Sequence, residues 1–377
     1  MFDYEFLRVI WWLLLGVLLI GFAVMDGFDL GVGALFRFVG KTDDERRAFL
    51  ETIEPVWEGN QVWFILGGGA VFAAWPLLYA ASFSGLYFAM LLVLIALILR
   101  PVGFVFRNKL TDPRWRNVWD WALCISGALP SLLFGVAFGN LFLGLPFHID
   151  DIARPVYTGS FWGLLHPFAL LVGVVSLSML LMHGGSYAAL KAGEPMAQRA
   201  RTAAQLFAVL LIVSFSAAGL WLAFGIDGHH IVSTIDPRGP SNPLRKSVEL
   251  VSGGWMQLMS DYPLAWLAPI AAYAGALLTI VLLRAQRDGL AFITSALAVS
   301  AVVLTGGLGL FPFLMPSSTD PGHGLTIWDA SSSRLTLGIM LVMTLIFVPI
   351  ILAYTTWVFR VLRGRVTLEH IRNSNHY

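Results

Sequence analysis

Residues 8–30 of the chain read RVIWWLLLGVLLIGFAVMDGFDL, with no charged side chain between Arg8 and Asp26. The hydrocarbon core of a bilayer is about 30 Å thick, and a helix rises about 1.5 Å per residue, so about 20 largely apolar residues are needed to cross it. No small-residue cleavage site interrupts the run, which argues against a removable signal peptide. We therefore predict that this segment is the first membrane-spanning helix.

The remainder of the chain has the same apolar character. Hydrophobic residues make up 57% of the 377 residues and charged residues 12%, with a mean hydropathy of +0.75, whereas soluble domains carry about 25% charged residues. We predict an all-α polytopic membrane protein with a single transmembrane domain over residues 1–377. Nine spans are expected, near residues 8–30, 59–80, 83–105, 118–140, 163–185, 204–224, 264–284, 291–313 and 335–360. The Trp75-Pro76 pair interrupts the second span.

The distribution of positive charge predicts the orientation of these spans. Cytoplasmic loops are enriched in Lys and Arg, and 18 of the 24 such residues fall after the first, third, fifth and seventh spans and in the C-terminal tail. The N-terminus is therefore expected outside and the C-terminus in the cytoplasm. The longest loop, residues 225–262, then lies on the outer side, and its turn-rich composition predicts an ordered cap.

Two carboxylates lie within the first predicted span, where lipid is a poor solvent for them. Asp26 and Asp29 are three residues apart, so they share one helix face near the cytoplasmic end. An ionised aspartate inside a span normally faces protein or water and often serves ion movement. We treat both as proton-pathway candidates. The alternative is that they lie at the headgroup boundary in contact with water, and this alternative is stronger for Asp29 than for Asp26.

The start of the second span adds further polar groups at the same depth. Glu58, Asn60 and Gln61 combine a carboxylate with two amides, a set that can hold a chain of waters at the cytoplasmic mouth. The nearby Trp57 and Trp63 are expected to be interfacial anchors.

Arg100, in the third predicted span, falls at a similar depth to these acids. We expect it to pair with Glu58, and the alternative is a snorkelling residue of the positive-inside type. Together with Asp26 and Asp29, these two residues form the predicted proton pathway.

The composition offers few cofactor ligands. Cys124 is the single cysteine, which excludes an intrachain disulfide and an all-cysteine metal site. Among the histidines, His166 and His183 lie in a predicted span, but 17 residues separate them, about 25 Å of helix, so they cannot ligate one iron. The outer-loop His229 and His230 lack evident partners. No cofactor, metal or nucleic-acid site is predicted in this chain.

Several ordered motifs resemble one known family, subunit II of cytochrome bd-type quinol oxidases, which includes cyanide-insensitive members. The matching stretches cover essentially the whole chain: DYEFLRVIWWLLLGVLLIGFAVMDGFDLGVG (3–33), EGNQVWF (58–64), FAAWPLLYAASFSG (72–85), RPVGF (100–104), RWRNVWDW (114–121), GVAFGN (135–140), SNPL (241–244), FPFLMPSS (311–318) and LTIWDASSS (325–333). Glu58 stands where Asp is familiar in the family, so the carboxylate is kept on a side chain one methylene longer.

The resemblance implies a nine-helix subunit of two four-helix bundles plus a peripheral helix. It also implies a partner, subunit I, that carries the haems b and d and the quinol site of an enzyme reducing dioxygen to water. Family pathway proposals involve the acids that match Asp29 and Glu58, with Trp57 and Arg100 nearby, while Trp63 resembles a residue near a proposed dioxygen route. A structural quinone in this subunit is left open, as are the quinone type, cyanide sensitivity and a small accessory subunit.

Two other functions compete with a proton-conducting and scaffolding subunit. An independent proton-coupled secondary transporter would need broken helices around a midplane site, and Gly306-Gly307 is the one candidate break, without a buried charge beside it. A pure scaffold, with each acid facing water, is the second alternative.

Overall fold

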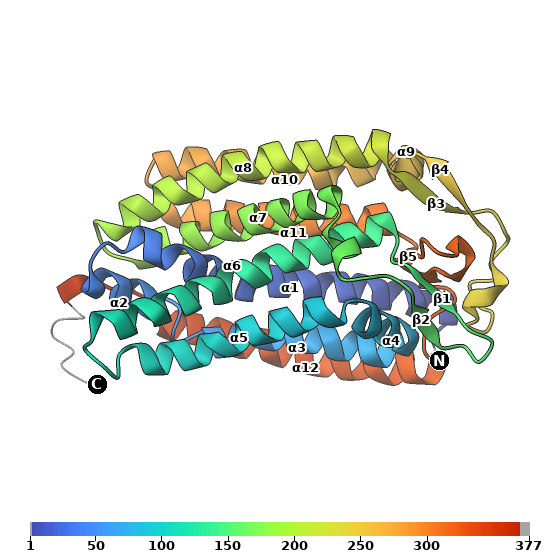
Figure 1. The fold of residues 1–377 in the computed structure, drawn as a ribbon, viewed down its shortest axis with the longest axis horizontal. Helices are drawn as coiled ribbons and strands as arrows, with labels where there is room; N and C mark the ends of the chain where they lie inside the picture. The colour runs from blue at the N-terminus through green and yellow to red at the C-terminus, as the bar shows by residue number, and fades with distance from the viewer. Residues whose placement is uncertain (1, 370–377) are drawn as a thin grey trace.

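The computed structural model describes residues 2–369 as an elongated array of helices that run along its long axis (Figure 1). Over these residues, eight helices are long and apolar enough to cross a membrane, and a bent helix pair raises the number to nine if it counts as one span. The eight are α1 (Tyr4–Val39), α5 (Tyr87–Arg107), α6 (Pro113–Leu143), α7 (Pro167–Lys191), α8 (Met196–Gly225), α10 (Leu267–Arg284), α11 (Asp288–Leu310) and α12 (Arg334–Val361). The predicted all-α membrane fold is confirmed, and the count of nine depends on the bent pair.

The bent pair is α3 (Trp57–Ala74) and α4 (Pro76–Gly85), whose axes differ by 119°. Pro76 starts α4, and the residue before a proline is disfavoured in helical conformation. Trp75 accordingly has φ −139° and ψ 72°. The stretch predicted as one span over residues 59–80 therefore consists of two helices.

Backbone groups freed at this bend find partners in a distant loop. Ser332 donates its N–H to the carbonyl of Ala74 (2.8 Å) and its hydroxyl to that of Ala73, while the Trp75 indole donates to Ser331 Oγ (3.0 Å). An unpaired backbone group inside a bilayer costs several kcal/mol, about as much as a lost hydrogen bond in hydrocarbon. The LTIWDASSS motif thus stabilises the broken helix.

Helix α1 lies at the centre of the packing. It contacts α3, α6, α7, α11 and α12, whereas α7, α8, α10 and α11 pack on one another and α5 packs on α6. Because α1 touches helices of both groups, the division into two four-helix bundles plus a peripheral helix stays a prediction. Helix α12 is the least covered span, with 11% of its most apolar window buried.

Two ends of the molecule differ in structure, as Figure 1 shows. One end, called here the α2 end, carries the short helix α2 (Asp43–Glu51) and the end of α12. The opposite, or strand, end carries three antiparallel pairs: β1 (Phe147–Ile149) with β2 (Pro155–Tyr157), β3 (Asp227–Ile231) with β4 (Val248–Ser252), and β5 (Phe313–Met315) with β6 (Leu325–Thr326). None of these short elements was predicted. Loop 225–262 holds β3, β4, α9 (Gln257–Asp261) and two 3-10 turns, η2 (Pro243–Arg245) and η3 (Gly254–Met256).

The candidate break at Gly306-Gly307 is not a break. Helix α11 runs without interruption from Asp288 to Leu310, and the Phe138 ring lies where a Cβ on Gly306 would be, 2.5 Å away at the nearest atom. This glycine therefore leaves room for the Phe138 ring of α6.

The closest approach between spans is that of α1 to α7. A Cβ on Gly31 would lie 2.1 Å from the carbonyl oxygen of Leu180, and Gly184 of α7 faces Gly31 with equally little space. We predict that Gly31→Ala forces these helices apart and destabilises the protein by about 1–3 kcal/mol, the usual range for overpacking. The measurement is the midpoint of thermal inactivation of purified protein.

Gly16→Ala is the matched control for this prediction. Gly16 lies in the same helix, and a Cβ there meets no atom of the described chain within 4 Å. If Gly31→Ala and Gly16→Ala shift the midpoint equally, the α1–α7 contact does not limit stability.

Candidate proton-transfer site

A buried ion pair joins α1 to α5. Arg100 Nη1 donates to Asp26 Oδ1 at 2.7 Å, and the two side chains are 3% and 1% exposed. A carboxylate or a guanidinium alone at this depth would carry a large desolvation penalty, so each requires the other. The pair fixes the position of α5 against α1.

One helical turn further along α1, a second carboxylate meets an amide. Asn60 Nδ2 of α3 donates to Asp29 Oδ2 at 2.8 Å, and both residues are buried. We call Asp26, Asp29, Asn60 and Arg100 the Asp26–Arg100 cluster. Three spans, α1, α3 and α5, contribute to it.

The cluster has hydrogen-bonding capacity to spare. Asp26 Oδ2, Asp29 Oδ1 and Arg100 Nη2 are buried atoms without a hydrogen-bond partner in the described chain. Buried polar groups are normally paired with protein or ordered water. Two carboxyl groups also face one guanidinium, so the cluster is neutral when it holds one proton. These features suit water-mediated proton transfer.

The predicted pairing of Arg100 with Glu58 is wrong. Arg100 pairs with Asp26, while Glu58 is exposed on the outer face of α3 and makes no hydrogen bond or ion pair among residues 2–369. Glu58 and Asn60 are two positions apart on one helix, about 200° around its axis, so they cannot face the same neighbour. Gln61, on the same side as Glu58, is half-buried.

Both tryptophans at the start of α3 are buried, which differs from the expected role as interfacial anchors. Trp57 packs on Phe104, with ring centroids 5.6 Å apart, and lies 5.9 Å from the Arg100 guanidinium carbon. Trp63 packs on Gly21 of α1, where a Cβ would be 2.5 Å from its ring. Trp57 therefore shields one side of the cluster, and Trp63 sets the distance between α1 and α3.

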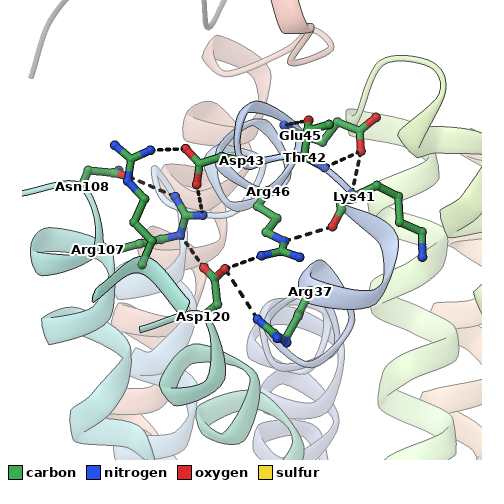
Figure 2. Close-up of polar contacts among 11 residues, drawn as sticks. Arg37, Lys41, Thr42, Asp43, Glu45, Arg46, Arg107, Asn108 and Asp120 are labelled. Atoms are coloured by element: carbon green, nitrogen blue, oxygen red, sulfur yellow. Dashed lines mark hydrogen bonds and ion pairs between the residues drawn. The ribbon is translucent and has the colours of Figure 1, made fainter. Parts of the chain in front are cut away.

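A larger network of charges closes the α2 end, and the sequence did not reveal it (Figure 2). Asp120 of α6 is buried and accepts hydrogen bonds from Arg107 Nε (2.6 Å) and Arg46 Nη1 (2.8 Å). Arg107 also donates to Asp43 Oδ1 at 2.8 Å. These contacts tie α2 to α5 and α6. A carboxylate inside the predicted span 118–140 was the one signal that could have found Asp120.

Glu45 anchors α2 to a further helix. It completes a capping box with Thr42, and its carboxylate accepts hydrogen bonds from Arg199 Nη2 (2.7 Å) and Nη1 (2.9 Å) at the start of α8. Hydrogen bonds from Arg199 and from the backbone N–H groups of Lys41 and Thr42 lower the pKa of Glu45 to about 2, despite partial burial. The ionised form is thus the stabilising one.

His183 and His166 make hydrogen bonds that hold helices in place. In His183, Nδ1 pairs with Ser295 Oγ (2.8 Å) and Nε2 with the carbonyl of Val24 (2.9 Å). His166 caps the start of α7 by accepting the N–H of Phe168. Over residues 2–369, no group of three or more His, Cys, Asp or Glu residues is placed to hold a metal ion. A metal ion bound by His183 would have to replace either Ser295 or the Val24 carbonyl at one ring nitrogen.

The Asp26–Arg100 pairing can be tested by a double-mutant cycle. We predict that Arg100→Gln and Asp26→Asn are each destabilising, because each leaves a buried group unpaired, and that their combination shows a coupling of about 0.5–3 kcal/mol. The measurement is denaturant unfolding in mild detergent. The control is the cycle of Arg100→Gln with Glu58→Gln, which should show a coupling of no more than about 0.5 kcal/mol. A larger coupling of Arg100 to Glu58 than to Asp26 would refute the assigned pair.

The pKa of Glu45 predicts a pH dependence of stability. A carboxylate with a lowered pKa in the folded state contributes fully above its ordinary pKa of 4.5, and this contribution is lost as the pH falls towards about 2. Thermal-inactivation midpoints of the wild type and Glu45→Gln should therefore differ at neutral pH and converge on acidification. A constant difference across this range would contradict the assignment.

Comparison with known proteins gives the chain a family. A family model described as cytochrome bd terminal oxidase subunit II matches residues 7–362. The "Probable cytochrome oxidase subunit 2" of Haemophilus influenzae and the "Cytochrome bd-I ubiquinol oxidase subunit 2" of Escherichia coli K12 are each 49% identical over 376 residues, which is 100% of this chain and 99% of each relative. The "Cytochrome bd ubiquinol oxidase subunit 2" of Bacillus subtilis is 31% identical over 96% of this chain and 97% of its own length.

A solved structure supports the fold independently. The bd oxidase of Geobacillus thermodenitrificans has a chain that aligns with a TM-score of 0.68 at 16% identity, covering 94% of this chain and 98% of that one. Its low identity limits this likeness to the fold, while the family model and the relatives span nearly the full length. The chain belongs to the family of cytochrome bd terminal oxidase subunit II.

Proposed function

We propose that the chain is the subunit II of a quinol:dioxygen oxidoreductase complex in the inner membrane of a bacterium, where it conducts protons from the cytoplasm and scaffolds its partner. Subunit I of that complex would carry the haems b and d and oxidise the quinol. The names of the Escherichia coli and Bacillus subtilis relatives, both ubiquinol oxidase subunits, support this activity. When bound in subunit I, the haems supply the dioxygen chemistry.

The Asp26–Arg100 cluster is the observation that carries the proton role. Its carboxylates are buried among α1, α3 and α5, yet each keeps one oxygen without a hydrogen-bond partner among residues 2–369. A purely structural ion pair would be expected to satisfy both oxygens, because an unpaired buried acceptor costs about 1–3 kcal/mol. Free acceptors on two carboxylates one turn apart suit a relay in which waters hand a proton from Asp29 to Asp26.

Glu58 is the entrance of this route in our proposal. It lies at the first turn of α3, close to the α2 end, and its exposed carboxylate can take a proton from water. Asn60 holds Asp29 on the inner side of the same helix turn. Glu58 collects the proton, waters held by Gln61 carry it around α3, and Asp29 receives it.

The scaffolding role rests on an uncovered face of the chain. Gly68 and Gly69 of α3 are exposed and have no described atom within 4 Å of a Cβ position, and the nearby Ile65 and Phe72 are 67% and 60% exposed. Small residues on a span allow close packing of another helix. We propose that the partner subunit covers this face of α3, which would also enclose Glu58.

The orientation follows the same proposal. The basic residues that end α1, α5, α7, α10 and α12 gather at the α2 end, and the C-terminal end of α12 lies there too (Figure 1). By the positive-inside rule, the α2 end faces the cytoplasm and the N-terminus lies outside.

A structural quinone in this subunit would find space near the strand end. A cavity of about 570 Å³ lies between α6, α7, α8, α10 and α11, with a largely apolar lining. Its walls include Phe138, Phe168, Phe215 and Trp255, and the hydrogen-bonded hydroxyls of Ser216 and Tyr273 (2.8 Å) offer the polar contact. Such a cavity suits an apolar ligand with one polar end.

The proton role is tested by Glu58→Gln in the purified complex. We predict that oxygen consumption with quinol falls at least ten-fold, since one proton relay typically contributes 10²–10⁴ to a rate, while haem spectra stay unchanged. Glu54→Gln is the matched control: it removes a carboxylate four residues away that makes no contact with the cluster, and turnover should stay within about two-fold of the wild type.

Three results would contradict this role. Unchanged turnover of Glu58→Gln would remove Glu58 from the route, and equal slowing by Glu54→Gln would reveal an effect of surface charge. Loss of haem would instead make Glu58 a residue of the subunit interface. The continuity of α11 removes the break at Gly306-Gly307 that the transporter alternative invoked.

A further inference from the structure

A second cavity opens at the α2 end, away from the Asp26–Arg100 cluster. It has a volume of about 370 Å³ and lies between the ends of α7, α11 and α12. Its lining combines three aromatic rings and three cations: Tyr187, Phe292, Phe359, Lys191, Arg363 and Arg365. Nothing in the proposed proton or scaffolding roles uses this site.

The deep side of the cavity is an aromatic wall. Tyr187 stacks on Phe28 with ring centroids 4.0 Å apart, and Phe292 lies 5.5 Å from Tyr187. Phe359 of α12 approaches Phe28 edge-on at 6.3 Å. The Tyr187 hydroxyl donates to the carbonyl of Thr52 (3.1 Å), so the wall presents little polarity of its own. This apolar surface is suited to packing against a hydrocarbon chain.

The rim of the cavity carries more positive charge than its carboxylates balance. Arg365 Nη2 lies 3.2 Å from Asp288 Oδ2, but both oxygens of Asp288 already accept hydrogen bonds from Arg201 at 2.8 Å. Lys191 Nζ donates only to the carbonyl of Leu362 (2.7 Å). Arg363 is exposed and has no ion pair or hydrogen bond within residues 2–369. An anion is the complement that this rim lacks.

Backbone contacts hold the rim in place. Val366 donates its N–H to the carbonyl of Lys191 (2.8 Å), and Gly193 donates to the carbonyl of Val366 (2.9 Å). The segment after α12 is thereby fixed across the end of α7. The backbone that carries the cations is positioned before any ligand arrives, which lowers the entropic cost of binding.

We propose that this cavity binds one anionic phospholipid of the adjacent leaflet. The phosphate lies against Arg363 and Arg365, and an acyl chain covers Phe292 and Phe359. Basic pockets between spans at the cytoplasmic side are suited to anionic headgroups, and guanidinium groups pair with phosphate in bidentate fashion. A soluble phosphate would leave the aromatic wall uncovered, and a zwitterionic lipid would leave the rim charge unbalanced.

The test compares lipid retention by variants of the purified complex. Wild type, Arg363→Gln and Arg360→Gln are reconstituted in nanodiscs of phosphatidylcholine with phosphatidylglycerol, transferred to detergent and analysed by native mass spectrometry. We expect the wild type to retain one phosphatidylglycerol, and Arg363→Gln to bind it about five-fold more weakly, the effect of one cation at a membrane surface. Arg363→Lys should largely restore retention.

Arg360→Gln is the matched control, because Arg360 is an exposed arginine one turn earlier that does not line the cavity. It should retain lipid like the wild type. Haem spectra monitor the fold of each variant, independently of lipid. Equal retention by Arg363→Gln and the wild type would overturn the proposal, as would equal loss in both glutamine variants, which would indicate a diffuse charged surface. Retention of phosphatidylcholine in place of phosphatidylglycerol would also overturn it.

Discussion

The ion pair between Asp26 and Arg100 is the constraint on which the α2 half of the molecule depends. Neither group can enter a bilayer interior alone at an acceptable free energy, and neither has another charged partner in the described chain within salt-bridge distance. Their contact therefore fixes α5 relative to α1 both in depth and in rotation. Phe104 and Trp57 then close over the guanidinium, and α3 takes its position from them.

The charge network around α2 stabilises the same geometry from the aqueous side. Asp120, Arg107 and Asp43 link α6, α5 and α2, and the Glu45–Arg199 contact extends the link to α8. These helices surround the end of α1, so movement of one requires several charged hydrogen bonds to break together. Such a rigid frame can hold two carboxylates at a fixed separation, which a relay of waters requires.

Hydropathy and charge counting predicted the membrane class. They also singled out Asp26 and Asp29, because a carboxylate inside a membrane span is costly in free energy and is therefore rare without a function. The partner of Arg100 could not be predicted in this way. It depends on the rotation of α3, which follows from the bend at Trp75-Pro76 and from Trp63 packing on Gly21. Helix α2 and the three strand pairs were missed because they are too short for a periodic pattern of apolar residues to be recognised.

The rotation of α3 also separates the roles of its polar residues. Since Asn60 points inward to Asp29, Glu58 must point outward, towards the face that carries Gly68 and Gly69. An exposed carboxylate beside an apolar, glycine-lined face is costly if lipid covers it, and acceptable if a partner chain and water do. In the proposed route, the position of Glu58 would couple proton entry to assembly, because the partner that covers the glycines would also enclose the entrance to the cluster.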